Sequence, residues 1–200
     1  MKETVESAIQ NLESGGFVMV YDSDSREKET DLVTPSSRIT PKKINRLRND
    51  AGGLICMTVP PKTWKKIGLP YLQDVLQDCR SEFPLLERMK ADDIPYDERS
   101  TFSLTINHRD TFTGITDSDR AKTIHRFAEM AQEMDGLREE RAQEMFGREF
   151  RTPGHVFLLN ATEGLLDKRQ GHTELTTALL ALGELYPDRK STRLNSSHRL

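Results

Sequence analysis

Residues 17–31 read F-V-M-V-Y-D-S-D-S-R-E-K-E-T-D and join an apolar run directly to an acidic one. The apolar run follows Gly15-Gly16 and is rich in β-branched and aromatic residues, so it predicts a buried strand. The next ten residues, from Asp22 to Asp31, hold five carboxylates and two basic side chains. They fit either a solvated, mobile loop or a site for a hard divalent cation that prefers oxygen ligands. Only the rest of the chain can decide between these interpretations.

The composition bounds the class of protein. The chain has 200 residues, of which 35% are hydrophobic and 30% charged, as expected for one domain with a polar surface. A net charge of -3 and the lack of a basic run interleaved with aromatics argue against a nucleic-acid partner. There is neither an apolar stretch long enough to span a bilayer nor an apolar secretion signal. We therefore expect a cytoplasmic protein with no membrane partner and with reduced thiols at its two cysteines, Cys56 and Cys79.

Alternating helix and strand signals surround the opening stretch. Apolar residues at helical spacing predict a helix that ends before Gly15-Gly16, and Thr40-Pro41 predicts the cap and first residue of a second helix. The run L-I-C-M-T-V, residues 54–59, predicts a strand. Cys56 lies inside it, where a lone cysteine is more often a small core residue than a nucleophile. Residues 64–99 are broken by prolines, and we assign no chemistry to them.

A further strand and helix follow in the middle of the chain. The alternation in T-F-S-L-T-I-N-H, residues 101–108, predicts a strand that buries Phe102, Leu104 and Ile106 on one face. The run T-G-I-T-D-S-D-R then predicts a turn and a helix start with Asp117 or Ser118 as its cap. The inner face of this helix is expected to consist of Ala121, Ile124, Ala128 and Ala131.

Two histidines lie at places suited to chemistry. In R-T-P-G-H-V-F-L-L, His155 stands between a proline-glycine turn and a predicted strand, although a lone histidine there is often only a structural hydrogen bonder. In R-Q-G-H-T, residues 169–173, the start of an amphipathic helix brings together an arginine, a glycine, a hydroxyl group and the helix dipole. These features describe a phosphate site with the imidazole of His172 beside it. Together with the acidic loop, they predict metal-assisted chemistry on a small phosphorylated molecule.

The ordered set D-S-D-S-R-E-K-E-T-D, T-G-I-T-D-S-D-R, P-G-H-V-F-L-L and R-Q-G-H-T-E resembles 3,4-dihydroxy-2-butanone 4-phosphate synthase in its archaeal-like form. The resemblance runs from about residue 5 to residue 187. It implies one α+β domain with a mixed sheet flanked by helices, and a homodimer with active sites near the subunit interface. It also implies a carbon-carbon lyase of riboflavin biosynthesis that converts D-ribulose 5-phosphate to L-3,4-dihydroxy-2-butanone 4-phosphate and formate.

The same resemblance implies roles for individual residues. Glu27 and His172 would be ligands of Mg²⁺ or Mn²⁺, and His155, Asp31 and Glu27 would be catalytic. Cys56, Thr113 and Asp119 are further candidates near the site. The residues expected to bind substrate are Arg26, Glu27, Asp31, Arg169, Gln170, Gly171, His172 and Thr173. The implied mechanism starts with proton removal next to a metal-polarised ketone and ends with release of C4 as formate. Acid and base roles are left unassigned.

The C-terminal residues depart from the family pattern. Residues 188–198 read D-R-K-S-T-R-L-N-S-S-H, which is the in-frame translation of a common sequencing-library adapter. We therefore expect residues 1–187 to be a C-terminally incomplete synthase domain and residues 188–200 to be a non-native tail. The family continues here into a strand with an essential glutamate. A non-catalytic protein that binds metal and phosphosugar is therefore the alternative to the lyase.

Overall fold

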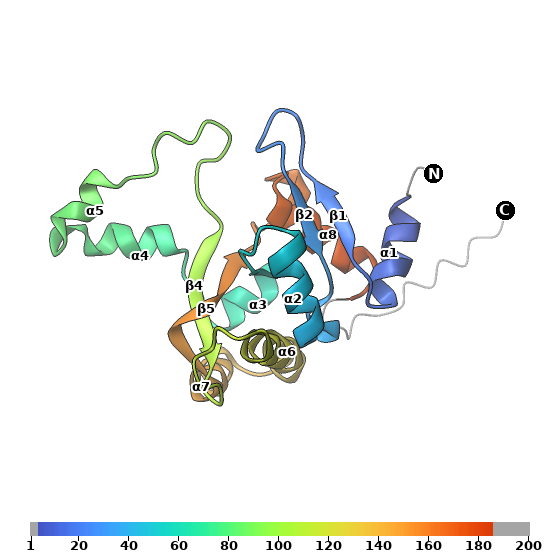
Figure 1. Cartoon of the computed structure of the whole chain (residues 1–200). Coiled ribbons are helices and arrows are strands. Elements are labelled where there is room, and N and C mark those ends of the chain that lie inside the picture. Colours follow the sequence, from blue (N-terminus) through green and yellow to red (C-terminus); the bar gives the residue numbers. More distant parts are fainter. Residues whose placement is uncertain (1–3, 186–200) are drawn as a thin grey trace.

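Two small sheets lie among helices in the computed structural model, which describes residues 4–185 (Figure 1). The main sheet has the order β3-β5-β4, with β5 parallel to β3 and antiparallel to β4. The expected mixed sheet is therefore present. The predicted strand over residues 17–21 is β1, which pairs with β2 in a separate antiparallel hairpin. The strands are β1 Val18–Tyr21, β2 Thr30–Val33, β3 Cys56–Val59, β4 Phe102–His108 and β5 Phe150–Asn160.

The four helices that the sequence predicts are present as α1, α2, α6 and α8, whereas α7 was not predicted. Thr40 caps α2 as expected, because its hydroxyl accepts a hydrogen bond from the Lys43 backbone N–H at 3.3 Å. The cap of α6 was predicted one or two residues too late, since Thr116 accepts from the backbone N–H of Asp119 at 3.1 Å. The helices are α1 Val5–Glu13, α2 Pro41–Asp50, α3 Pro61–Lys66, α4 Leu72–Asp78, α5 Pro84–Arg88, α6 Asp117–Glu133, α7 Glu139–Glu149 and α8 His172–Leu182. Short 3₁₀ turns lie at Ser36–Arg38, Cys79–Ser81 and Leu165–Asp167.

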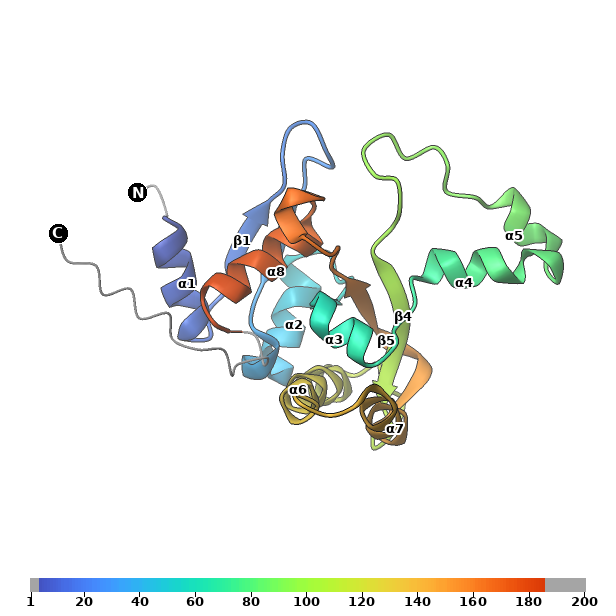
Figure 2. The ribbon, with the colours of Figure 1, turned by 180° about the vertical axis from the view of Figure 1, so that it is seen from behind.

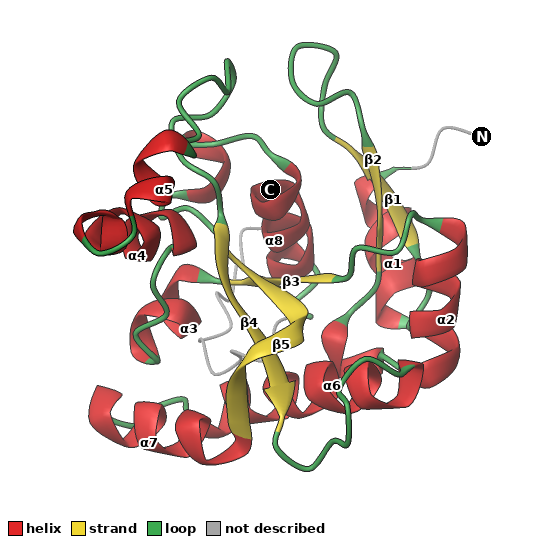
Figure 3. Ribbon diagram, turned by 60° about the vertical axis from the view of Figure 1, so that its left-hand side comes forward, coloured by secondary structure: helices red, strands yellow, loops and turns green. Residues whose placement is uncertain are grey.

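The main core lies between the three-stranded sheet and α2, α6 and α7. In Figure 3, α6 and α7 run beneath one end of this sheet. All four residues expected on the inner face of α6 are buried there. A smaller apolar cluster holds α1 and β1 against α8, through Ala8, Leu12, Val18 and Leu180. The cluster thereby fixes α1 and the hairpin against the C-terminal part of α8.

The alternation predicted for β4 is only partly correct. Ile106 is buried, but Phe102 and Leu104 are half-buried, whereas the polar Ser103 and Asn107 are buried. The pairing of β4 with β5 shifts between Phe102 and Thr105 and again between Ile106 and Asn107. Each shift moves the following side chains to the other face of the strand, which breaks a simple two-residue period.

The segment T-P-G before His155 is strand and not a turn, because β5 runs through it from Phe150 to Asn160. At Gly154 the two strands come unusually close. A Cβ atom there would lie 2.0 Å from the backbone carbonyl carbon of Ile106. The glycine is therefore required by the approach of β4.

We expect Gly154→Ala to destabilise the fold by about 3 kcal/mol, the upper end of the usual cost of overpacking, because the obstacle is backbone. Equilibrium urea unfolding measures the change in free energy. Gly147→Ala is a suitable control for a glycine substitution, because Gly147 lies within α7 and a Cβ there meets no atom within 4 Å. If the two variants lost equal stability, the close strand contact would not be the cause.

Two loops and one pair of helices extend beyond the main body. The loop between β1 and β2 and the loop between α5 and β4 rise on the same side of the domain, and α4 and α5 project to one side (Figures 1 and 2). Within residues 4–185, no helix is long and apolar enough to cross a membrane. The expected domain boundary at residues 187 and 188 lies outside the described residues.

Candidate active site

A cleft of about 620 Å³ lies between the hairpin, β3 and the start of α8. Its walls include six of the residues that the sequence proposed for the site. These are Glu27, Asp31, Cys56, Arg169, His172 and Thr173. Residues more than 140 positions apart, such as Glu27 and His172, thus meet across one cavity.

The acidic loop is folded around Asp22. The fully buried carboxylate of this residue accepts hydrogen bonds from the backbone N–H groups of Glu27 at 2.8 Å and Glu29 at 3.3 Å. Burial would raise the pKa of Asp22, but the N–H groups of Glu27, Ser23 and Glu29 and the nearby His172 outweigh it and lower that pKa below its usual value. The loop is thus ordered by an ionised carboxylate directly after β1.

His172 is oriented by the same loop. It is the first residue of α8, and its Nε2 lies 3.0 Å from the backbone oxygen of Glu29. A carbonyl oxygen can only accept, so Nε2 is the donor and carries the proton. Nδ1 then faces Glu27, whose Oε2 lies 3.6 Å away. Nδ1, a nitrogen that can bind a metal when it carries no proton, is in this way held beside a carboxylate.

Asp22, Glu27 and His172 form a possible metal site. Each offers one ligand atom, and these atoms all lie within 4.8 Å of one another. Two carboxylates with one imidazole form a donor set that suits Mg²⁺ or Mn²⁺. The sequence proposed Glu27 and His172 as ligands and did not single out Asp22. Its position directly after the strand that anchors the loop was the available signal.

Neither arginine of the expected substrate site is free. Arg169 donates from Nε to one oxygen of Asp97 at 3.0 Å and from Nη2 to the other at 2.5 Å. Its Nη1 donates to Glu174 at 2.5 Å. Arg26 also donates to both oxygens of Asp97, at 3.1 and 3.0 Å. The sequence assigned no chemistry to the segment that holds Asp97, and nothing in its local pattern marked this residue.

The other residues of the R-Q-G-H-T motif have different surroundings. A Cβ at Gly171 would lie 2.3 Å from Nη1 of Arg169, so this glycine makes room for the guanidinium group. Gly171 is also the N-cap of α8. The buried hydroxyl group of Thr173 lies 3.1 Å from that of Thr101. Gln170 is exposed, and its side chain is outside the lining of the cleft.

Cys56 lines the cleft as a neutral thiol. Burial, with a smaller contribution from the charge of Asp31, raises the pKa of Cys56 to about 12. Thiolate is the nucleophilic form of cysteine, so this side chain is not an activated nucleophile at neutral pH. The interpretation of Cys56 as a packed residue is consistent with this environment.

His155, Thr113 and Asp119 form a second cluster, away from the lining of the cleft among the described residues. The exposed His155 has its Nδ1 3.1 Å from the side-chain nitrogen of the buried Asn107. Asn107 also donates to the backbone oxygen of Thr113 at 3.4 Å. The carboxylate of Asp119 accepts from the N–H of Gly114 at 2.9 Å. These contacts order the turn before α6 next to His155.

Comparisons with known proteins agree with this arrangement. A family model for 3,4-dihydroxy-2-butanone 4-phosphate synthase matches residues 6–193. The synthase of Methanothermobacter thermautotrophicus is 44% identical over 181 residues, which cover 90% of this chain and 76% of the relative. That of Methanosarcina acetivorans is 45% identical over 190 residues, which cover 92% and 74%.

A solved synthase structure in complex with two magnesium ions is also similar. Its TM-score is 0.69 and its identity 26%, over 92% of this chain and 72% of that structure. The expected single-domain α+β fold is therefore correct. The chain belongs to the 3,4-dihydroxy-2-butanone 4-phosphate synthase family.

Proposed function

We propose that this chain is a carbon-carbon lyase that converts D-ribulose 5-phosphate to L-3,4-dihydroxy-2-butanone 4-phosphate and formate in riboflavin biosynthesis. The observation that carries the proposal is the meeting of Glu27 and His172 beside Arg169 and Asp31 in one cleft. These residues have the donor types that a metal and a phosphosugar require. Membership of the synthase family supports the choice of reaction.

Mg²⁺ or Mn²⁺ is the proposed cofactor, with Glu27 and His172 as ligands and Asp22 as a third. A divalent cation there would supply Lewis acidity that favours loss of a proton beside the ketone. Arg26, Glu27 and Asp31 would contact the sugar, and the segment from Arg169 to Thr173 would hold its phosphate end. The neutral thiol of Cys56 would line the cleft without reacting.

We further propose that the protein acts as a cytoplasmic homodimer. The fully exposed ring of Phe112 and the exposed Ile115 flank Thr113 on the turn beside His155. Such apolar exposure next to an ordered polar cluster suits a contact between subunits. The cluster of one subunit would then complete the cleft of the other, which gives His155 its catalytic role. The free thiols of Cys56 and Cys79 fit a reducing compartment.

The C-terminal residues enter the proposal as well. We propose that residues 188–200 are a non-native tail and that the native enzyme continues differently after Pro187. In this proposal, a native continuation would supply the glutamate that the resemblance to the family implies. A chain restored with the C-terminal segment of the Methanothermobacter relative is therefore the proper active form for testing the reaction.

Formate release from D-ribulose 5-phosphate with Mg²⁺ tests the function. We expect the restored chain to release formate catalytically, over many turnovers, and the 200-residue chain to release far less. Formate is measured by a coupled formate dehydrogenase assay. Lys28→Gln, which changes an exposed cation on the same loop, serves as a control that should remain active. A restored chain that binds Mg²⁺ and substrate but releases no formate would contradict the lyase and favour a binding protein.

A further inference from the structure

Asp97 joins three segments that are distant in the sequence. Its carboxylate accepts hydrogen bonds from the guanidinium groups of two arginines. Arg26 belongs to the acidic loop, and Arg169 to the segment before α8. Arg26 also donates to the backbone oxygen of Tyr96 at 3.3 Å and lies 5.3 Å from the centre of its ring. These contacts hold the loop between α5 and β4 at the cleft, which Tyr96 and Asp97 line.

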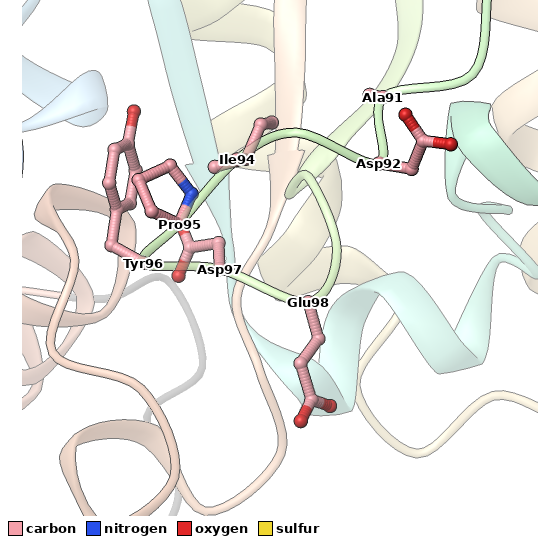
Figure 4. Close-up of a pocket in the computed structure, with 7 residues that line it drawn as sticks. All are labelled: Ala91, Asp92, Ile94, Pro95, Tyr96, Asp97 and Glu98. Carbon is pink, nitrogen blue, oxygen red and sulfur yellow. The ribbon is translucent and has the colours of Figure 1, made fainter.

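The other carboxylates of this loop have no such contacts. Figure 4 shows the bend of residues 91–98, which lines a second hollow, with Asp92 on one arm and Glu98 on the other. Both are exposed, and neither has a hydrogen bond or ion pair within residues 4–185. The side chain of Asp97 is only 9% exposed. Burial and pairing therefore distinguish Asp97 from its acidic neighbours.

Two guanidinium groups share the carboxylate of Asp97. Arg169 also pairs with Glu174, while the other carboxylates near Arg26 lie farther away, at 3.8 Å from Nε to Asp22 and 4.0 Å from Nη2 to Glu27. A phosphate group at neutral pH carries nearly two negative charges and three acceptor oxygens, so it complements a pair of arginines better than one carboxylate does. Asp97 occupies the position that such a group would need.

We propose that Asp97 is a specificity-determining residue that competes with the phosphate group of the substrate for Arg169 and Arg26. The proposal rests on the function given above, in which Arg169 holds the phosphate end. Substrate binding exchanges one ion pair for another, and the loop that carries Asp97 moves away from Arg169. A sugar without phosphate cannot make this exchange, so the internal carboxylate adds to discrimination against uncharged sugars.

The test is the affinity for inorganic phosphate in the presence of Mg²⁺, measured by titration calorimetry on the full chain. Asp97→Asn keeps the shape of the side chain and removes the competing charge. We expect it to bind phosphate about tenfold more tightly, because a hydrogen bond between charged groups is typically worth about that factor. Glu98→Gln removes a charge from the same loop without touching either arginine, and its affinity should stay that of the wild type.

Two results would overturn the competition. If Asp97→Asn bound phosphate more weakly or equally well, Asp97 would hold the arginines in place for the ligand or play no part in binding. Should Asp97→Asn not fold, Asp97→Ser is expected to give the same gain, and thermal unfolding identifies a folded variant. In the restored chain, the Michaelis constant for ribulose 5-phosphate should fall by a similar factor with no rise in turnover.

The variant Arg169→Lys distinguishes a failure of the competition by Asp97 from a failure of the proposed phosphate site. A lysine keeps the charge but loses the forked geometry, so phosphate binding should weaken in both the wild type and Asp97→Asn. If Arg169→Lys changed phosphate affinity in neither background, phosphate would not reach Arg169 and the proposed phosphate site would be wrong. If it weakened binding while Asp97→Asn had no effect, only the competition would fail.

Discussion

His172→Gln is expected to lower the affinity for Mg²⁺ at least about 100-fold and to abolish formate release by the restored chain. Nδ1 of His172 faces Glu27, and its Nε2 is tied to the backbone of the acidic loop at 3.0 Å. Glutamine can replace the hydrogen bond to Glu29 but offers no imidazole nitrogen to a metal. The variant therefore removes a metal ligand while it keeps the contact with the acidic loop.

Binding of Mn²⁺ as a paramagnetic substitute measures the first effect, and the coupled formate assay the second. His125→Gln is the matched control, because His125 lies on the exposed side of α6 and outside the cleft. It should leave both quantities unchanged. If His172→Gln bound the metal as tightly as the control, the metal would lie elsewhere and the cluster of Asp22, Glu27 and His172 would be structural.

The elements that frame the cleft were largely predictable because their signals are local. The apolar run at residues 18–21, the Thr40-Pro41 cap and the glycine before His172 each specify an element through neighbours in the chain. Where the sequence went wrong, a nonlocal contact decided. The close approach of β4 at Gly154 accompanies a strand where a turn was expected. The shifts in the pairing of β4 with β5 break the expected alternation of buried and exposed side chains in β4.

The charges that organise the site were less predictable. Asp97 lies 72 positions from Arg169, in a segment without regular periodicity, so no spacing rule connects the two residues. Glu174 follows the recognisable motif, yet its burial depends on the backbone of Thr162 and on Arg169. The chemistry of Glu27 and His172 came from the family resemblance. The ion pairs between loops required the three-dimensional arrangement.

Glu174→Ala is expected to cost about 3–5 kcal/mol of unfolding free energy, the usual effect of removing one partner from a buried ion pair. The side chain of Glu174 is 0% exposed. One of its oxygens accepts from the backbone N–H of Thr162 at 2.8 Å, and the other from Arg169 at 2.5 Å. Alanine would leave the backbone N–H of Thr162 without an acceptor. It would also leave the half-buried guanidinium group of Arg169 with one carboxylate fewer to balance its charge. Urea unfolding measures the loss.

Glu163→Ala is the control for removing a carboxylate from the same region, because Glu163 is 69% exposed and pairs only with the exposed Lys65 among the described contacts. It should change stability little, since exposed ion pairs contribute weakly. The double variant Glu174→Leu with Arg169→Met tests the cause, because it removes both charges of the pair while Asp97 keeps its contacts with Arg26. Recovery of part of the lost stability is expected, since the backbone N–H of Thr162 still lacks its partner. If the double variant were as unstable as Glu174→Ala, packing and the Thr162 hydrogen bond would account for the role of Glu174, and charge pairing would not.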